Sequence, residues 1–477
     1  MRILFINCVS KTDFTYSVPL ATGYLASYLK GKFKEKLYVK AVSIADKDKL
    51  LQIVKEYKPD IVGLTVTTPG YDYAKELSKS IRKLDKKVVI VAGGAHITLF
   101  PDAIIPEIDY AVAGEGEQTF HELLKYLYPK ISIGKPPKTK KEIDGLIFWE
   151  NKKLHINKPR EFIKDLDSVG LPERALLNPT NNTLFTSRGC PYNCIYCSSP
   201  IIWRRTFRMH SVEYILEDIK RLYSLKHSVQ WFGDDLFICN KQRIRDLIQL
   251  MKKEKLLGKI SFIALGRSNL IDEEMIKLLK ELNVLVIHFG FETGDNEILQ
   301  YAKNSKAISV EQNKKASDLC RKYGILVQGY AMMGFPQDTH ETIMNSFNFF
   351  KKYSDLMDTP NMLMVFPKTA LCEELKQKTG KDYSKIHLEK IKLSFGGSMP
   401  VTNETILCDN VTPKEFDMYK KKFHDAGKIK NKIFYTKLFT KLVFSKGFFL
   451  NMYYLYNIFI TSLRNPRREH ISETVEL

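Results

Sequence analysis

Near its middle the chain carries the segment Thr186-Ser187-Arg188-Gly189-Cys190-Pro191-Tyr192-Asn193-Cys194-Ile195-Tyr196-Cys197. Its cysteines follow C-x3-C-x2-C spacing, and thiolates are the natural ligands of iron–sulfur clusters. With this spacing, one short loop can bind three corners of a [4Fe–4S] cubane and leave the fourth iron without a protein ligand. Such an open iron can chelate the amino and carboxylate groups of a small molecule, as an open zinc site takes its substrate. We therefore predict a cluster on Cys190, Cys194 and Cys197.

Two other interpretations of these cysteines stay open. A structural zinc site normally takes four ligands, and the nearest candidate for a fourth is His210. Structural cysteines could also cluster by chance. A strand-like run at Leu184–Thr186 and a βα pattern after the loop favour the iron–sulfur interpretation.

A second βα series begins after Pro172 and continues to about Thr369. Polar side chains follow several of its predicted strands, and such recurrence at successive strand ends favours a shared cleft, as in βα barrels. The carboxylates among them could instead cap or charge the start of the next helix.

The cysteine segment resembles the signature of the radical S-adenosylmethionine (SAM) superfamily, including an aromatic residue, Tyr196, just before the third cysteine. The resemblance implies a partial (β/α)6 barrel over residues 181–372 and a reduced cluster that cleaves SAM to a 5′-deoxyadenosyl radical. It also implies an electron donor of the flavodoxin or ferredoxin type. In such enzymes the cofactor performs the hard chemistry, and the protein positions it. The residues implied in SAM binding are Tyr196, Asp234, Asp235, Arg267, Glu292 and Met332.

The first 130 residues alternate apolar runs with helical patterns such as Tyr73–Leu84. This alternation predicts a doubly wound, Rossmann-like parallel sheet, in which a ligand lies beyond the carboxyl ends of the strands. The predicted strands are Ile3–Cys8, Leu37–Ile44, Ile61–Val66, Val88–Ala92 and Tyr110–Ala113. We expect residues 131–180 to form a linker with a hairpin at Leu146–Ile156.

Glycines and threonines follow three of these predicted strands. The three segments are Thr65-Val66-Thr67-Thr68-Pro69-Gly70, Gly93-Gly94-Ala95-His96 and Gly114-Glu115-Gly116-Glu117. Glycine lets the backbone approach a ligand closely, and threonine offers a hydroxyl group. Ordinary turns after strands are the alternative interpretation.

A parallel α/β domain in front of a radical SAM domain resembles the cobalamin-binding radical SAM family over roughly residues 1–370. The resemblance implies bound cobalamin, with its nucleotide tail entering the N-terminal sheet near Thr65–Thr68. The chain has no Asp-x-His-x-x-Gly pattern to supply a lower ligand to cobalt, and that family usually lacks one. The implied cobalamin contacts are Thr65, Thr67, Thr68, Gly93, Gly94, His96, Gly114, Glu115 and Gly116.

This family resemblance favours methylation of an unactivated carbon, with methylcobalamin as the methyl donor. Radical cyclisation, ring rearrangement or C–C bond formation, on a small molecule or a lipid, stays open. A methylthiolating RNA-modifying enzyme would carry a second cluster on three N-terminal cysteines, and here only Cys8 is present. A non-catalytic iron–sulfur redox sensor would explain the cysteines but not the carboxylates and arginine at the strand ends.

The composition of the whole chain indicates the compartment in which the protein acts. Eight cysteines in 477 residues do not make a disulfide scaffold. The apolar run at the start is too short for a signal peptide, and no apolar run reaches the ~18–20 residues of a spanning helix. We therefore expect a cytoplasmic protein.

The C-terminal region, residues 373–477, is expected to be helical, and it holds much of the formal charge of +20. No acidic residue occurs between Asp425 and Glu469, and lysines alternate there with aromatic runs. One interpretation is a helical cap on the barrel. Another is a pair of interfacial helices at the inner face of the membrane. Nucleic acid is not an expected partner, because the aromatic runs are too apolar for exposed stacking platforms.

Overall fold

The computed structural model describes residues 1–9, 19–392, 401–444 and 470–477, which form two compact units. Unit 1 contains Met1–Asn181 and the described C-terminal residues. Unit 2 contains Asn182–Ile391 and the described part of Ser398–Arg464. The segment expected as a linker, residues 131–180, thus belongs to unit 1, and the helix after Thr412 belongs to unit 2.

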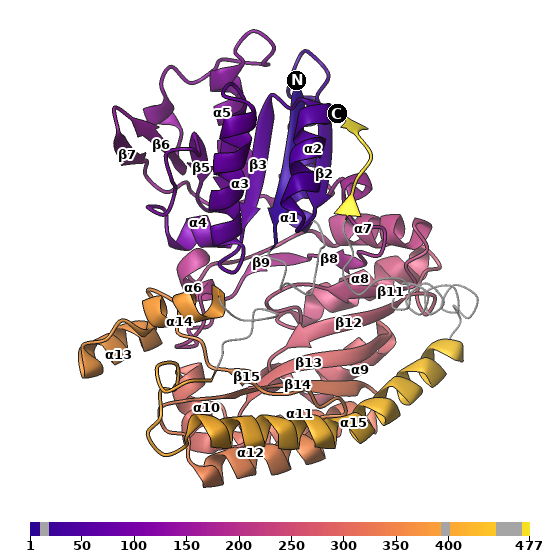
Figure 1. Cartoon of the computed structure of the whole chain (residues 1–477). Coiled ribbons are helices and arrows are strands. Elements are labelled where there is room, and N and C mark those ends of the chain that lie inside the picture. Colours follow the sequence, from indigo (N-terminus) through magenta and orange to yellow (C-terminus); the bar gives the residue numbers. More distant parts are fainter. Residues whose placement is uncertain (10–18, 393–400, 445–469) are drawn as a thin grey trace. The chain divides into compact units, whose positions relative to one another are not determined.

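Unit 1 is built around a parallel sheet with the strand order β2-β1-β3-β4-β5 (Figure 1). The strands are β1 (Arg2–Cys8), β2 (Tyr38–Ser43), β3 (Ile61–Val66), β4 (Val89–Gly93) and β5 (Tyr110–Val112). The helices are α1 (Leu20–Leu29), α2 (Lys47–Tyr57), α3 (Tyr71–Leu84), α4 (Ala95–Leu99) and α5 (Gly116–Leu127). The strands are almost continuously apolar because helices cover a parallel sheet on both faces. The doubly wound sheet predicted from the alternation is confirmed.

Two antiparallel additions extend this sheet. The hairpin of β6 (Leu146–Glu150) and β7 (Lys153–Ile156) pairs through β6 with β5. At the other edge, β16 (His470–Ile471) and β17 (Val475–Glu476) both pair with β2. The hairpin was expected, but its place in the sheet was not, and the C-terminal end was expected to be helical. Edge strands present unpaired backbone groups, and these short segments satisfy them.

Unit 2 contains an open sheet of six parallel strands in the order β15-β14-β13-β12-β11-β8, with helices along one face (Figure 1). Its strands are β8 (Thr183–Leu184), β11 (Val229–Phe232), β12 (Ser261–Gly266), β13 (Val284–Glu292), β14 (Leu326–Met333) and β15 (Asn361–Met362). Its helices up to β15 are α6 (Ser199–Ile202), α7 (Val212–Ser224), α8 (Lys241–Lys253), α9 (Glu273–Glu281), α10 (Asn296–Lys303), α11 (Val310–Lys322) and α12 (His340–Tyr353). The predicted partial barrel is confirmed. A separate hairpin joins β9 (Ser187–Gly189) to β10 (Phe207–Met209).

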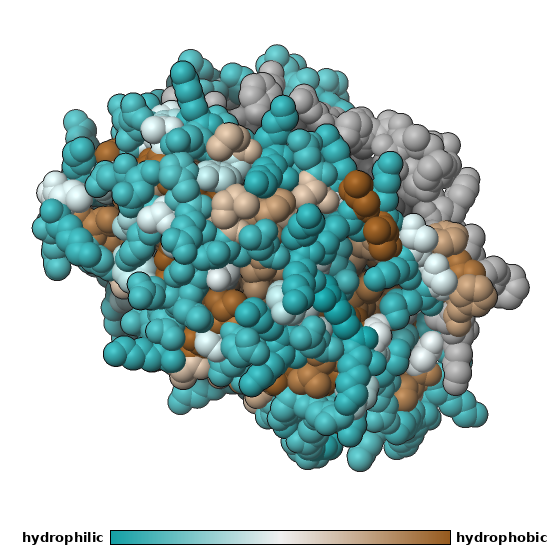
Figure 2. Space-filling view, turned by 90° about the horizontal axis from the view of Figure 1, so that it is seen from below, coloured by the Kyte–Doolittle hydropathy of each residue, from teal (hydrophilic) through white to brown (hydrophobic). Residues whose placement is uncertain are grey.

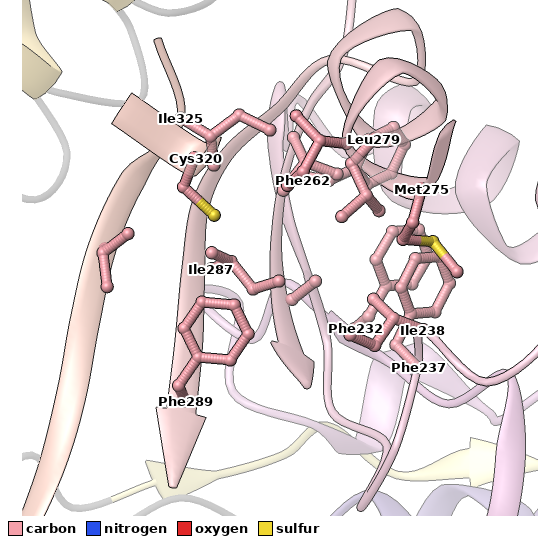
Figure 3. Packing of buried hydrophobic residues seen from close by; sticks show 14 of the residues in the cluster. Phe232, Phe237, Ile238, Phe262, Met275, Leu279, Ile287, Phe289, Cys320 and Ile325 are labelled. Atoms are coloured by element: carbon pink, nitrogen blue, oxygen red, sulfur yellow. The ribbon is translucent and has the colours of Figure 1, made fainter. Parts of the chain in front are cut away.

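The main core of unit 2 lies between this sheet and its helices. Alternate strand residues, such as Phe262 and Ala264 or Ile287 and Phe289, pack into this core, because successive side chains of a strand point to opposite faces. The Phe232 ring stacks on Phe237 and on Phe262, with centroids 3.9 and 4.7 Å apart. Figure 3 shows these rings with Ile238, Met275, Leu279, Ile287, Phe289, Cys320 and Ile325.

Three helices follow β15. They are α13 (Ala370–Thr379), α14 (Tyr383–Lys392) and α15 (Pro413–Val443). The long helix α15 begins with a capping box between Thr412 and Glu415. Its residues Phe434 and Leu442 pack with Val286 and Leu326 of the sheet, on the face opposite the main core. The short 3-10 helices are η1 (Lys140–Glu142), η2 (Leu166–Val169), η3 (Arg174–Leu176) and η4 (Ser268–Leu270).

Helix α15 therefore fills one end of the open face of the sheet, as the helical-cap interpretation expects. Within the described ranges, no helix is both long enough and apolar enough to cross a membrane. The aromatic stretch from 445 to 469, on which the interfacial interpretation partly rests, lies outside the described residues.

Candidate functional site

The three clustered cysteines lie in one loop directly after β9. Gly189 ends this strand at φ +95°, and a Cβ there would come within 2.2 Å of the Thr206 carbonyl oxygen. Only glycine fits this turn, because the conformation and the close approach both exclude a side chain. The loop from Cys190 to Cys197 therefore leaves the β9–β10 hairpin at a fixed point.

The middle of the loop is held from two sides of unit 2. The Ile195 N–H donates to the carbonyl of Ala302 in α10 at 3.0 Å, and the Leu371 N–H of α13 donates to the Ile195 carbonyl at 3.0 Å. The Ile195 side chain is buried among apolar residues of α10, α13 and the segment after β15. The cysteines on either side of it, Cys194 and Cys197, stay half-buried and free of disulfides.

The surroundings of the thiols make unassisted ionisation difficult. Burial raises the pKa of Cys197 to about 12, and it also raises the pKa of Cys190. Against this, the Arg267 guanidinium lies 3.6 Å from the centroid of the Tyr192 ring, and its Nη1 donates to Cys194 Sγ at 3.5 Å. A bound metal deprotonates a coordinating thiol outright. The sulfurs are thus suited to hold a cationic group.

The fit to a cluster depends on the chemistry of the donors, three free thiols on one short loop. Across the described part of the chain, no group of three or more His, Cys, Asp or Glu side chains is arranged to hold a metal ion. Burial raises the pKa of a fourth thiol, Cys239, and the nearby Cys190 adds to this rise.

The structure separates the two adjacent carboxylates that follow β11. Asp234 is only 1% exposed, and its Oδ1 accepts from the backbone and hydroxyl of Thr186, both at 2.9 Å, and from the Ser187 hydroxyl. This carboxylate joins β11 to the start of the cysteine segment, and its expected role in SAM binding stays a prediction. Asp235 is exposed and accepts from the Ser199 hydroxyl at 3.1 Å, while the Ser199 N–H donates to Cys197 Sγ at 3.4 Å.

The other residues expected at this site converge on the cysteine loop. Met332 packs in the same apolar cluster as Ile195 and Tyr196. The Tyr196 hydroxyl donates to Glu292 Oε1 at 2.8 Å, and burial raises the pKa of this phenol well above its usual range. Lys303, which the sequence interpretation missed, donates to the same carboxylate oxygen at 2.5 Å. No local sequence pattern marks this lysine.

The open face of the sheet carries a second group of residues that the sequence interpretation missed. His288 Nδ1 lies 2.6 Å from the Tyr330 hydroxyl, and the imidazole lies 5.1 Å from Trp231 between ring centroids. Burial lowers the pKa of His288 to about 4, so this imidazole is neutral at pH 7. Trp231 and Tyr330 are partly exposed, unlike the strand residues that face the main core. Reading β13 with a period of two places His288 on the same face as Gly290, and this signal could have found it.

Unit 1 contains a cavity of about 140 Å³ at the carboxyl ends of β3, β4 and β5. A Cβ at Gly93 would have no neighbour closer than 3.7 Å, and one at Gly114 would meet nothing within 4 Å. Bare backbone therefore borders open space at both positions. The lining comprises Phe5, Ala21, Leu25, Gly63, Leu64, Thr65, Val91, Ala92, Gly93, Gly94, Val112, Gly114, Gly116, Glu117 and Phe120. This apolar cradle fits a flat organic group such as the nucleotide base of cobalamin.

Five of the residues expected to contact cobalamin line the cavity, and four do not. The lining ones are Thr65, Gly93, Gly94, Gly114 and Gly116. Thr67 is exposed outside the cavity, and Thr68 bonds to His96 Nδ1 at 3.2 Å while that imidazole stacks on Tyr71. Glu115 accepts from the Ile163 N–H at 2.8 Å. Thr68, His96 and Glu115 thus make contacts within the protein, and their expected role in binding cobalamin stays a prediction.

Comparison with protein-family models matches both units. The model of the radical SAM superfamily matches residues 184–350, and the model of the B12 binding domain matches residues 11–124. The first match contains the cysteine loop, and the second contains β3, β4 and β5, at whose carboxyl ends the cavity lies.

Two curated relatives cover most of the chain. An uncharacterized methyltransferase, PH0819, from Pyrococcus horikoshii is 32% identical over 392 residues, or 78% of this chain and 83% of that protein. The anaerobic magnesium-protoporphyrin IX monomethyl ester cyclase of Rubrivivax gelatinosus is 26% identical over 402 residues, or 79% of this chain and 70% of that protein.

Among solved structures, the radical SAM methyltransferase TsrM from Kitasatospora setae aligns with a TM-score of 0.65 at 20% identity. The alignment covers 79% of this chain and 76% of TsrM. The cobalamin-dependent radical enzyme OxsB aligns with a TM-score of 0.62 at 20% identity, over 88% of this chain and 61% of OxsB. At these identities, the likeness concerns the fold.

Proposed function

This chain belongs to the cobalamin-dependent radical SAM methyltransferase family, and from this membership we propose that it transfers a methyl group to an unactivated carbon. When bound, the cluster and SAM supply a 5′-deoxyadenosyl radical that removes a hydrogen atom from the substrate, and cobalamin supplies the methyl group. The observation that carries the proposal is the loop of three free thiols, held by Ala302 and Leu371 beside the strand ends of a partial barrel.

The cysteine loop and its neighbours supply the groups that this chemistry needs. Cys190, Cys194 and Cys197 would bind three irons, and the hydrogen bond from Arg267 to Cys194 Sγ would stabilise the thiolate charge. Asp235, exposed beside Cys197, is available to accept from the ammonium or ribose hydroxyls of SAM. Met332 and Tyr196 give this space an apolar wall.

We place the nucleotide tail of cobalamin in the cavity of unit 1. The tail would lie against the backbone at Gly93 and Gly114, where no side chain intervenes. Phe5 and Phe120, whose ring centroids are 5.9 Å apart, would pack against its base. Of the two acids in Gly114-Glu115-Gly116-Glu117, Glu117 lines the cavity. Its carboxylate is therefore the one that would meet a polar group of the ligand.

We propose further that the substrate is a largely apolar molecule with few polar groups, bound on the open face of the sheet. Trp231 offers a flat apolar surface, and the Tyr330–His288 pair offers a single polar contact. Phe434 and Leu442 of α15 cover one end of this face of the sheet and exclude water there. The cyclase relative acts on a magnesium porphyrin ester, which is a molecule of this kind.

Product analysis tests the proposed function. We expect protein purified without oxygen and supplied with iron, sulfide, cobalamin, SAM and dithionite to release 5′-deoxyadenosine. With methyl-deuterated SAM and an extract of apolar metabolites, a product should gain one labelled methyl group, and S-adenosylhomocysteine should form alongside. Release of 5′-deoxyadenosine without any labelled product would favour cyclisation or rearrangement. Absence of both products contradicts the radical mechanism and favours the redox sensor. A flavodoxin or ferredoxin as the natural reductant stays a prediction, checked by replacing dithionite with each carrier.

A contact with an anionic membrane is a further part of the proposal. Helix α15 exposes Ile429 and Ile433, at 70% and 51%, beside the exposed Lys428 and Lys432. Figure 2 shows apolar side chains lying in patches among hydrophilic ones on one face of the molecule. Lysines near anionic headgroups and apolar side chains in the acyl boundary are typical of interfacial helices.

Vesicle sedimentation at physiological salt tests this contact. We expect the chain to sediment with phosphatidylglycerol vesicles and not with phosphatidylcholine vesicles. Replacing Ile429 and Ile433 with serine should weaken the binding, while replacing the exposed Ile156 of unit 1 should not. Equal binding to both vesicle types, or by both variants, contradicts the contact.

A further inference from the structure

An ion pair lies buried against the cysteine loop. Lys303 Nζ is 2.5 Å from Glu292 Oε1, and the two side chains are 5% and 6% exposed. The Tyr196 hydroxyl donates to the same oxygen at 2.8 Å and lies 3.3 Å from Lys303 Nζ. Lysine and glutamate are almost never fully buried unless they are paired. Because Tyr196 stands between Cys194 and Cys197, this pair contacts the loop from within the protein.

The backbone of β13 is shaped around this pair. Glu292 has φ +62°, a conformation that is uncommon for a residue with a side chain. The register between β13 and β14 shifts between Gly290 and Glu292. A Cβ at Gly290 would come within 2.4 Å of Glu292 Oε1 and within 3.0 Å of Lys303 Nζ. The positive φ of Glu292, the register shift and the missing side chain at Gly290 together make room for the Glu292 carboxylate. Backbone strain of this kind tends to occur at functional sites.

The end of α10 brings Lys303 to the loop. The helix ends at Lys303, and Asn304 caps it in the left-handed conformation with φ 49°. In the same turn, the Ala302 carbonyl accepts from the Ile195 N–H at 3.0 Å. Ala302 and Ile298 also pack in the apolar cluster that contains Ile195. The last turn of α10 therefore holds the loop twice, once by its backbone and once through Lys303, Glu292 and Tyr196.

We propose that Lys303 is a positioning residue of the radical site. Through Glu292 it fixes Tyr196, and thereby the spacing of Cys194 and Cys197, and its ammonium group cancels the carboxylate charge beside the cluster. Removing one partner of a buried pair leaves an uncompensated charge. Hydrogen bonds and net charge near a cluster set its reduction potential, so a bare Glu292 carboxylate would make the cluster harder to reduce. This inference rests on the proposed function only for the presence of the cluster.

Five variants of the full chain, reconstituted with iron and sulfide, test the role of Lys303. Iron per chain, the midpoint potential of the cluster measured by EPR without SAM, and the rate of 5′-deoxyadenosine release with SAM are measured for each. For Lys303→Met we expect a more negative potential and SAM cleavage slower by roughly tenfold. Lys303→Arg keeps the charge and should retain the potential. Lys306→Met, at an exposed lysine on the same segment, should match the wild type in every measurement.

The double variant Glu292→Gln/Lys303→Met separates charge from packing. It removes both charges, so we expect its potential to return toward the wild-type value even where SAM cleavage stays slow. Wild-type potential in Lys303→Met, or equal displacement of the potential in the single and double variants, overturns the proposal. Should Lys303→Met fail to fold, the neutral double variant and Tyr196→Phe carry the test. Tyr196→Phe removes one hydroxyl and should slow SAM cleavage severalfold at unchanged iron content, and an unchanged rate overturns the positioning role. A wild-type chain that takes up no cluster would instead refute the proposed function.

Discussion

At the strand ends of unit 1 the chain offers bare backbone, whereas at those of unit 2 it offers sulfur and charged side chains. Gly93 and Gly114 leave space beside β4 and β5. In unit 2 the equivalent positions carry Arg267, which donates to Cys194, and Glu292, which is locked to Lys303. A site made of bare backbone selects a ligand by shape, and a site made of thiolates selects it by coordination. The two sites should therefore fail in different ways when they are altered.

The largest effect is expected at the thiols. Replacing Cys190, Cys194 and Cys197 together with alanine removes every proposed iron ligand, so bound iron and 5′-deoxyadenosine release should fall to background. Cobalamin bound per chain should stay unchanged, because its cavity lies in unit 1. Iron analysis, cofactor absorption and chromatography of the nucleoside check these outcomes.

Cys239→Ala is the matched control for this prediction. This thiol is half-buried like the three loop cysteines and lies near Cys190. Its removal should leave iron content and SAM cleavage intact. Loss of iron in this variant would make Cys239 a fourth ligand and would contradict the open iron on which SAM chelation depends.

The next largest effect is expected at Gly93. A valine there would project into the cavity, and its Cβ would have no neighbour closer than 3.7 Å, so the fold should tolerate it. Overpacking a filled space typically costs about 1–3 kcal/mol, which corresponds to roughly 5- to 150-fold weaker cobalamin binding. SAM cleavage at the cluster should persist. Equilibrium dialysis with cobalamin and the 5′-deoxyadenosine assay measure the two sites separately.

Thr67→Val is the control for Gly93→Val. Thr67 follows the same sheet but is exposed outside the cavity, so its replacement should leave cobalamin affinity unchanged. If Gly93→Val binds cobalamin as well as the wild type, the tail does not lie in this cavity.

The sheets could be predicted from the sequence because their strands are continuous apolar runs. Ile61–Val66 and Val284–Glu292 are buried along nearly their whole length. The strands at the C-terminus could not be predicted in this way. His470 and Ser472, which are buried there, are polar, and the backbone pairing with β2 joins residues more than 400 positions apart.

The residues of the candidate sites also differ in whether the sequence alone could reveal them. Cysteine spacing is local, so the loop could be found from sequence. Asp234 and Asp235 are neighbours in the chain, and only the fold shows that the first points into the protein while the second stays exposed. Lys303 and His288 act through partners on other elements, Glu292 and Tyr330, and no local pattern encodes such pairs.

A smaller effect is expected from the neutral imidazole on the open face of unit 2. The pKa of His288 is lowered to about 4 in the folded chain, against about 6.5 when unfolded. As pH falls from 7 to 5, His288 binds a proton in the unfolded state but not in the folded state. This histidine therefore lowers the unfolding free energy by about 2 kcal/mol over that range. In His288→Gln that contribution should vanish, whereas Tyr330→Phe should keep it. Denaturant titrations at both pH values measure this contribution. If the unfolding free energies of His288→Gln and the wild type change equally between pH 7 and pH 5, the buried neutral state is contradicted.

The smallest effect separates two acids of one motif in unit 1. Glu115 accepts from the Ile163 N–H, while Glu117 lines the cavity. Glu115→Gln keeps an acceptor but loses the charge, so the unfolding free energy should fall by about 1 kcal/mol with cobalamin affinity unchanged. Glu117→Gln should weaken cobalamin binding a fewfold, because a polar contact made by the cavity wall is altered. If Glu115→Gln is the variant that loses cobalamin, the carboxylate beside Ile163 contacts the ligand after all, and unit 1 would select its cofactor by charge as well as by shape.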